Sequence, residues 1–153
     1  MLFAVFMNSF TLVQVTLVKD INTLPGGSSP SNIIEAGGII FFTYTTPAYG
    51  TELWKTDGSV AGTVMVKDIY PGSVSSYPYY LTNVNGVLYF RVDDGVNGTE
   101  LWKSVGTTSG TSLVKDIYSG SSYSSPSNLT NVNGVLYFSA NDGVNRLESL
   151  KDK

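Results

Sequence analysis

The chain of 153 residues contains neither cysteine nor histidine. Their absence excludes disulfides, thiolate or imidazole metal sites, and nucleophiles that a histidine would activate. Because a cysteine-free chain is compatible with reducing and oxidising compartments alike, cysteine usage does not identify the compartment.

Charge is scarce as well. Charged residues make up 14% of the chain and the formal net charge is −3. The sequence offers no basic patch for a phosphate backbone, so we expect no nucleic-acid partner. Residues 1–10 are apolar but lack a basic n-region and are too short to span a bilayer, so we expect no membrane span. We interpret them as a worn copy of the repeat described next, with a targeting role as the alternative.

What the chain does have is a repeat. The motif GTELWK at 50–55 returns unchanged at 98–103, 48 residues later. Aligning 50–97 with 98–145 gives 32 identical residues of 48. One structural unit has therefore been copied along the chain, and its architecture decides the fold.

Each unit predicts four strands. The first ends at a tight turn, Asn85-Gly86 or Asn133-Gly134 in the later copies, and Asn-Gly is the strongest short hairpin signal. The second strand (39–44, 87–92 and 135–140) begins with four consecutive apolar residues, which indicates cover on both faces. The third contains TELWK, whose tryptophan we interpret as a packing group. The fourth contains VKDI, at 18–21, 66–69 and 114–117.

These strands predict an all-β chain with a single repeat domain over 1–153. It has a degenerate N-terminal segment (1–30), unit 1 (31–70), unit 2 (79–118) and a truncated unit 3 (127–153), joined by links rich in Ser, Tyr and Pro. Four-stranded antiparallel units of this length are typical of β-propeller blades, so we expect a propeller-like array of three blades. A flat solenoid is the rival architecture.

Three stretches carry a resemblance to a known family. GTELWKTDGS, VAGTVMVKDI and NVNGVLYF resemble the ELWxxDGT repeats of long bacterial proteins. The resemblance implies a propeller-like β-repeat in secreted or cell-surface proteins and implies no activity. The copies depart from the pattern where Ser59 replaces Thr, where Val105 replaces Asp, and at 146–151, where only Glu148 and Lys151 of GTELWK survive.

Three blades are too few for a ring, since propellers have four to eight. We therefore expect an open arc, half of a ring made by two copies, or part of a longer array, with self-association in the second case. The VKDI-containing segment at 13–21 could supply a fourth strand to unit 3.

Repetition argues against catalysis. Acidic residues recur once per unit, whereas an active site needs a constellation that occurs once. We interpret them as structural, for instance as carboxylates that accept hydrogen bonds from a neighbouring turn: Glu52, Glu100 and Glu148, and Asp20, Asp68 and Asp116. We therefore expect no enzyme, no catalytic residue, no metal and no cofactor. A hydrolase or lyase with axial carboxylates is the alternative.

Calcium is the one ion that the turns suggest. Asp93, Asp94 and Asn97 supply hard oxygen ligands within a short loop, but the EF-hand spacing is absent. An ordinary Gly- and Asx-rich turn explains the same residues.

The differences between copies point to a contact surface. Loops between second and third strands, and links between units, meet at one rim of the sheets, and this rim holds nine of the 16 mismatches. Tyr with Ser is a mixture used by binding loops. We predict a non-catalytic module that contacts a protein or glycan through Tyr70, Tyr77, Tyr79, Tyr80, Asp93, Asp94, Asn97, Tyr118 and Tyr123. Freely drifting surface loops, or a scaffold without a ligand, are the alternatives.

Overall fold

The computed structural model describes residues 19–21, 29–144 and 148–151. Every regular element in these residues is a β-strand, so the predicted all-β class is confirmed. Within the same residues there is no helix long and apolar enough to cross a membrane. The apolar start at 1–10 and most of the N-terminal segment lie outside the described residues.

The strands form three antiparallel sheets that coincide with the three units. Unit 1 contains β1 (Ser31–Ala36), β2 (Ile39–Thr46), β3 (Gly50–Thr56) and β4 (Val64–Lys67). Unit 2 contains β5 (Tyr79–Val84), β6 (Val87–Asp93), β7 (Thr99–Ser104) and β8 (Thr111–Lys115). Unit 3 contains β9 (Ser127–Val132), β10 (Val135–Ala140) and β11 (Glu148–Lys151). In each sheet the strands pair in chain order, as a meander does.

The predicted hairpin turns are present. Asn85 and Gly86 have φ angles of 52° and 84°, and Asn133 and Gly134 have 51° and 78°. Positive φ at both central residues defines the type I′ turn, for which Asn-Gly is the preferred pair.

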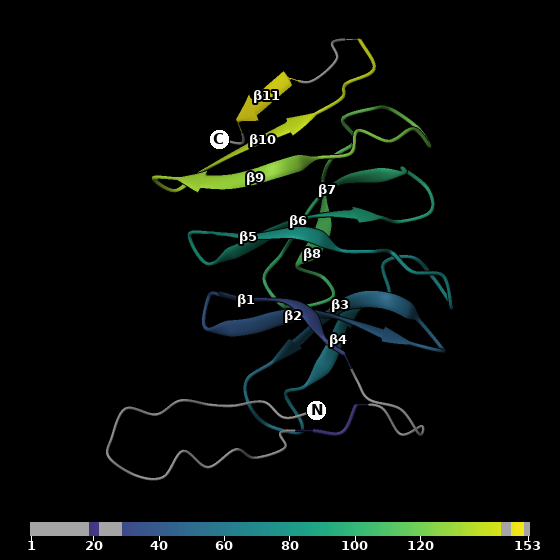
Figure 1. Cartoon of the computed structure of the whole chain (residues 1–153), viewed down its shortest axis with the longest axis vertical. Helices are drawn as coiled ribbons and strands as arrows, with labels where there is room; N and C mark the ends of the chain where they lie inside the picture. Colours follow the sequence, from purple (N-terminus) through teal and green to yellow (C-terminus); the bar gives the residue numbers. More distant parts are fainter. Residues whose placement is uncertain (1–18, 22–28, 145–147, 152–153) are drawn as a thin grey trace.

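The three units are stacked one above another (Figure 1). Their first strands are neighbours, since β1 contacts β5 and β5 contacts β9. We call the face of a sheet toward the following unit its upper face and the opposite face its lower face. One hydrophobic core joins the upper face of unit 1 to the lower face of unit 2, and includes Leu53, Leu88 and Trp102. A second joins units 2 and 3 through Leu101, Leu136 and Phe138.

Burial of the second strand differs between the units. In β2 the four residues Phe41 to Tyr44 are all buried, which confirms cover on both faces there. In β6 every second residue is buried and those between are only half-buried. The half-buried positions include Tyr89 and Arg91, where β2 has the smaller or fully apolar residues Phe41 and Thr43. The four-residue apolar run therefore overstated the burial of this strand.

Polar side chains repeat the same contacts between successive units. Asn83 donates from its amide to the backbone oxygen of Glu35 (3.0 Å), and Asn131 donates to that of Asn83 (2.9 Å). Lys55 donates to the oxygen of Gly106 in the next unit (2.6 Å). These contacts fix the position of each sheet on its neighbour, in addition to the hydrophobic cores.

The predicted fourth strand of unit 3 is not found in the described residues. The third sheet contains three strands, in the order β11-β10-β9. Residues 19–21, the described end of the segment predicted to complete it, lie in no strand. Instead Lys19 donates to the oxygen of Thr63 (2.8 Å), so this segment lies beside unit 1. The eroded GTELWK copy does form a strand, β11, which pairs with β10.

Candidate binding surface

Each link between units is held by a buried glutamate. Glu52 follows the first two residues of β3 and has no exposed surface. Its carboxylate accepts hydrogen bonds from the N–H groups of Ile69 (3.1 Å) and Ser76 (3.2 Å), and from the Ser76 hydroxyl (2.7 Å). The structural interpretation of this repeated acid is thereby confirmed.

Glu100 repeats this arrangement one unit later. It accepts hydrogen bonds from the N–H groups of Ile117 (3.1 Å) and Ser124 (3.1 Å) and from the Ser124 hydroxyl (2.5 Å). Burial raises the pKa of Glu52 from 4.5 to about 7, although these donors act in the opposite direction. Burial likewise raises the pKa of Glu100. Both carboxylates are buried and bonded to the link.

The glycine that opens GTELWK has no side chain, so the backbone of the link can lie against the start of the third strand. Gly98 has a φ of 70°, and a Cβ at this position would lie 2.2 Å from the oxygen of Ser122. Gly50 is in the same situation against Ser75. The backbone of the link then runs beside the start of β3, where Thr51 accepts hydrogen bonds from the N–H groups of Ser76 and Tyr77.

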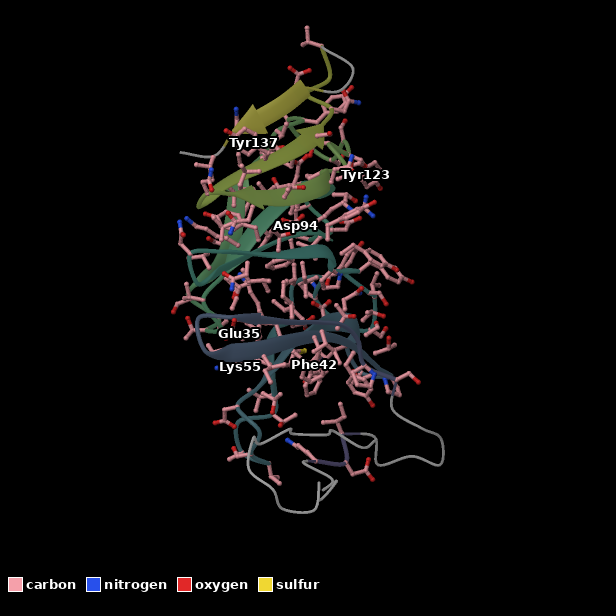
Figure 2. The ribbon with its side chains drawn as sticks, turned by 60° about the vertical axis from the view of Figure 1, so that its left-hand side comes forward. Glu35, Phe42, Lys55, Asp94, Tyr123 and Tyr137 are labelled. Carbon is pink, nitrogen blue, oxygen red and sulfur yellow. The ribbon has the colours of Figure 1, made fainter. Side chains whose placement is uncertain are left out.

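The link also bonds to the loop after the second strand, as predicted for a shared rim. Asp93 donates its N–H to the oxygen of Ser76 (3.0 Å), and Asn141 donates to that of Ser124 (2.9 Å). Figure 2 shows Tyr123 on one side of the stack and Glu35, near a hairpin, on the opposite side. The links and the loops after the second strands therefore form one edge of the molecule.

The predicted tyrosines divide into two groups. Tyr70 and Tyr118 are half-buried, and each covers a glycine of the following unit: a Cβ on Gly95 or Gly143 would lie 2.6 Å from the Tyr ring. These two tyrosines pack units together and are not part of an open surface. Tyr77, Tyr79, Tyr80 and Tyr123 are exposed.

Two of the exposed tyrosines lie beside a cation in unit 2. The guanidinium carbon of Arg91 lies 5.6 Å from the centre of the Tyr79 ring and 4.9 Å from that of Tyr80. Such distances are typical of cation–π contacts. Arg91 is the register partner of Tyr79 across β5 and β6, which explains how the two side chains meet.

Units 1 and 3 hold different residues at these positions. In unit 1 the same register pair is Ser31 and Thr43, whose hydroxyls form a hydrogen bond of 2.9 Å. In unit 3 it is Ser127 and Ser139. The tyrosine and arginine cluster is therefore found in unit 2 alone among the described units, where it replaces a pair of small hydroxyl side chains.

A hollow of about 460 Å³ adjoins this cluster. It lies between the first strands of units 1 and 2 and is lined by Asn32, Ile33, Ile34, Tyr79, Tyr80 and Leu81. Ile33 is exposed, so the lining of the hollow includes an accessible apolar side chain beside the polar groups of Asn32 and the tyrosines. Sequence reasoning missed Arg91 and Ile33. The signal for Arg91 was available, because residues 79 and 91 differ from the other copies together.

The carboxylates in the acidic loop of unit 2 accept hydrogen bonds from the loop's own backbone. Asp93 accepts a hydrogen bond from the N–H of Gly95 (2.8 Å). Asp94 accepts from the N–H groups of Val96 (2.9 Å) and Asn97 (2.7 Å), and from the Asn97 amide (2.7 Å). These bonds form a turn that needs no ion. Within the described residues, no group of three or more Asp and Glu side chains is placed to hold a metal.

Comparison of the chain with family models, with curated proteins and with solved structures finds no match. The resemblance to the ELWxxDGT repeats thus remains a prediction from the sequence.

Proposed function

We propose that this protein is a non-catalytic binding module that contacts its ligand through Tyr77, Tyr79, Tyr80 and Arg91 of unit 2. One observation carries the proposal. Residues 76–80, which lead into unit 2, read SYPYY, whereas the matching residues 28–32 and 124–128 both read SSPSN. All three changes are to tyrosine, and the three side chains are 56%, 45% and 46% exposed.

The backbone at Tyr80 supports a functional origin. Tyr80 has a φ of 56°, and the matching residues Asn32 and Asn128 have 52° and 55°. Asparagine tolerates this left-handed conformation, whereas a bulky side chain there costs about 1–2 kcal/mol. Strained residues gather at binding and active sites, where function maintains them against their cost.

The chemistry of the surface fits a protein loop or a glycan. Tyrosine rings give large amphipathic contact area with little loss of rotamer entropy, and Arg91 adds hydrogen-bond donors. The apolar hollow beside them can take one side chain or one ring of the ligand. Because Glu52 and Glu100 are occupied by the links, a hydrolase with these carboxylates has less support.

The proposed architecture is the propeller-like array. Contacts between β1 and β5 and between β5 and β9 support it, because first strands lie together when they are innermost. The ligand surface then begins at the inner strand of unit 2. A secreted or cell-surface location, as the family resemblance implies, belongs to the same proposal.

The test uses the residues of the neighbouring units as substitutions. A glycan array and a pull-down with extracellular protein are performed with the wild type and with the triple variant Y77S/Y79S/Y80N. The matched control is Tyr123→Ser, which removes an exposed tyrosine from the link between units 2 and 3. We expect ligands that the wild type and the control retain and the triple variant loses. Equal binding by all three proteins would show that the ligand contacts another surface, and no binding by any of them would leave only a scaffold role.

A further inference from the structure

Arg91 is a cation without an acidic partner in the described part of the chain. Its guanidinium lies against the rings of Tyr79 and Tyr80, 5.6 and 4.9 Å from their centres, and forms no ion pair or hydrogen bond with the described residues. Asp93 follows two residues later on the same side of β6, but its carboxylate accepts a hydrogen bond from the N–H of Gly95 (2.8 Å). A guanidinium has five N–H donors, and ring faces supply no oxygen acceptor for them. The charge of Arg91 is therefore available to a ligand.

Other cations of the stack serve to join its units. Three lysines donate to a backbone oxygen of the following unit over 2.6 to 3.1 Å: Lys19, Lys55 and Lys67. Arg91 has no such contact, and the matching residues of units 1 and 3 are the uncharged Thr43 and Ser139. The stacking of units thus requires no charge at this position, and the arginine occurs where the neighbouring tyrosines occur.

A single guanidinium is suited to a single carboxylate. Its planar fork of donors matches the two oxygens of a carboxylate, and Arg91 is half-buried beside two rings, which lessens competition from water. Nucleic acids and polyphosphates need several cations, and the formal net charge of −3 disfavours them. The site therefore favours a ligand that brings isolated carboxylates to a largely uncharged surface.

The tyrosines favour a ligand with a ring next to its carboxylate. Tyr79 and Tyr80 are 45% and 46% exposed, so each keeps surface for a ligand beside Arg91. A uronic acid carries its carboxylate directly on a sugar ring, whose C–H groups pack on aromatic rings. Its hydroxyls can bond with polar groups of Asn32 and the tyrosines, which line the adjoining hollow. An acidic peptide, in contrast, has to supply the carboxylate and the flat surface from two different side chains.

We propose that the ligand of unit 2 is an acidic polysaccharide that contains uronic acid residues. This assignment rests on the binding function proposed above and names the class of its ligand. The carboxylate of one uronate forms a bidentate pair with Arg91, and its sugar ring packs against Tyr79 or Tyr80. The next sugar of the polymer lies over the hollow between β1 and β5.

The first test separates the charge of the ligand from its sugar rings. The full chain is titrated calorimetrically, with a chelator present, with polygalacturonate, alginate and hyaluronate and with the methyl ester of each. The ester keeps the rings and loses the charges. We expect at least one polyuronate to bind, and its ester to bind roughly tenfold more weakly, as the loss of one charge-assisted pair predicts. Polyglutamate has carboxylates but no sugar rings, and should also bind more weakly. Equal binding of acid and ester, tighter binding of polyglutamate, or no binding of any polyuronate would overturn the proposal.

The second test assigns the recognition to Arg91. The double variant Y79S/R91T recreates the pair of Ser31 and Thr43, so the hairpin keeps an arrangement that unit 1 already has. This variant should lose the preference for acid over ester, whereas Arg91→Lys should retain part of it, since an ammonium keeps the charge but not the fork. The control Lys103→Gln removes an exposed cation of the same unit and should bind like the wild type. A double variant that melts like the wild type and keeps the full preference would overturn the proposal.

The outcomes distinguish the ligand assignment from the binding function itself. A ligand that Y77S/Y79S/Y80N loses, but that carries no carboxylate, would leave the binding function in place and overturn the assignment to uronates. Polyuronates that bind this triple variant as tightly as the wild type would contradict both.

Discussion

The buried glutamates predict that the protein becomes less stable as the pH rises from 5 to 8. Glu52 has no exposed surface, and burial raises its pKa from 4.5 to about 7. Burial raises the pKa of Glu100 as well. In the unfolded chain both side chains are in water and ionise near the ordinary value of a glutamate.

The sign follows from proton binding. A carboxylate whose pKa is higher in the folded state holds its proton more tightly there. Its contribution to stability is complete below the unfolded pKa of 4.5 and is lost as the pH rises through the folded value of about 7. For Glu52 alone the linkage relation gives a loss of roughly 2.5 kcal/mol in the free energy of unfolding between about pH 5 and pH 8. Glu100 adds a loss in the same direction.

The assay is urea unfolding at several pH values, followed by tryptophan fluorescence. Trp102 lies in the core between units 1 and 2 and reports on their packing. The double variant E52Q/E100Q cannot ionise at these positions, so its stability should be nearly independent of pH over this range. The control Glu35→Gln removes an exposed carboxylate and should keep the slope of the wild type.

Ser76 gives a second check. The hydrogen bond from its hydroxyl lowers the pKa of Glu52 more than any of the backbone hydrogen bonds does. We therefore expect Ser76→Ala to raise that pKa further, to steepen the loss above pH 7, and to lower stability by about 1.5–3 kcal/mol when the carboxylate is charged. Asp57 does not interfere, because its pKa is lowered and its contribution is lost only as the pH falls toward 3.8 and below. A wild type whose stability is constant or rises from pH 5 to 8 would refute the reasoning.

Two further predictions concern single positions. Gly98→Ala should destabilise the protein by about 2–4 kcal/mol, since it adds a clash with Ser122 to the strain of positive φ. Gly120 has a φ of 87° but open space around it, so Gly120→Ala should cost only about 1 kcal/mol. Thermal or urea unfolding of the two variants separates the cost of the clash from that of the strain. Tyr80→Asn should change stability by less than about 1 kcal/mol, because relief of strain offsets the lost contact with Arg91. A loss above about 2 kcal/mol in the same unfolding assay would show that Tyr80 serves packing rather than binding.

The strands and turns were predictable because their signals are local. Asn85-Gly86 fixes a hairpin by the φ angles that its two residues accept, whatever surrounds them. The exact repeat of GTELWK placed β3 and β7 in the same role. The structural role of Glu52 could also be inferred, since a residue present in every unit is a poor candidate for a single active site.

The roles of the tyrosines could not be predicted, because contacts with another unit decide them. Tyr70 and Tyr77 belong to the same link, yet Tyr70 covers Gly95 of the next unit and Tyr77 is exposed. The amino-acid composition of the link does not distinguish the two tyrosines. The position of residues 19–21 was harder still to predict, since Lys19 donates a hydrogen bond to Thr63, 44 residues away.

The division between constant and variable residues explains how a repeat could acquire a ligand. Glu52 accepts hydrogen bonds from Ile69 and Ser76, and thus holds the backbone of the link at two points before the variable tyrosines at 77, 79 and 80. The side chains at 77, 79 and 80 then project from a backbone whose course does not depend on them. We infer that substitution there changes the ligand without unfolding the unit. Grafting SYPYY onto 124–128 of unit 3, together with Ser139→Arg, should therefore create a second site with the same preference, and a stable graft that binds no additional ligand would contradict this division.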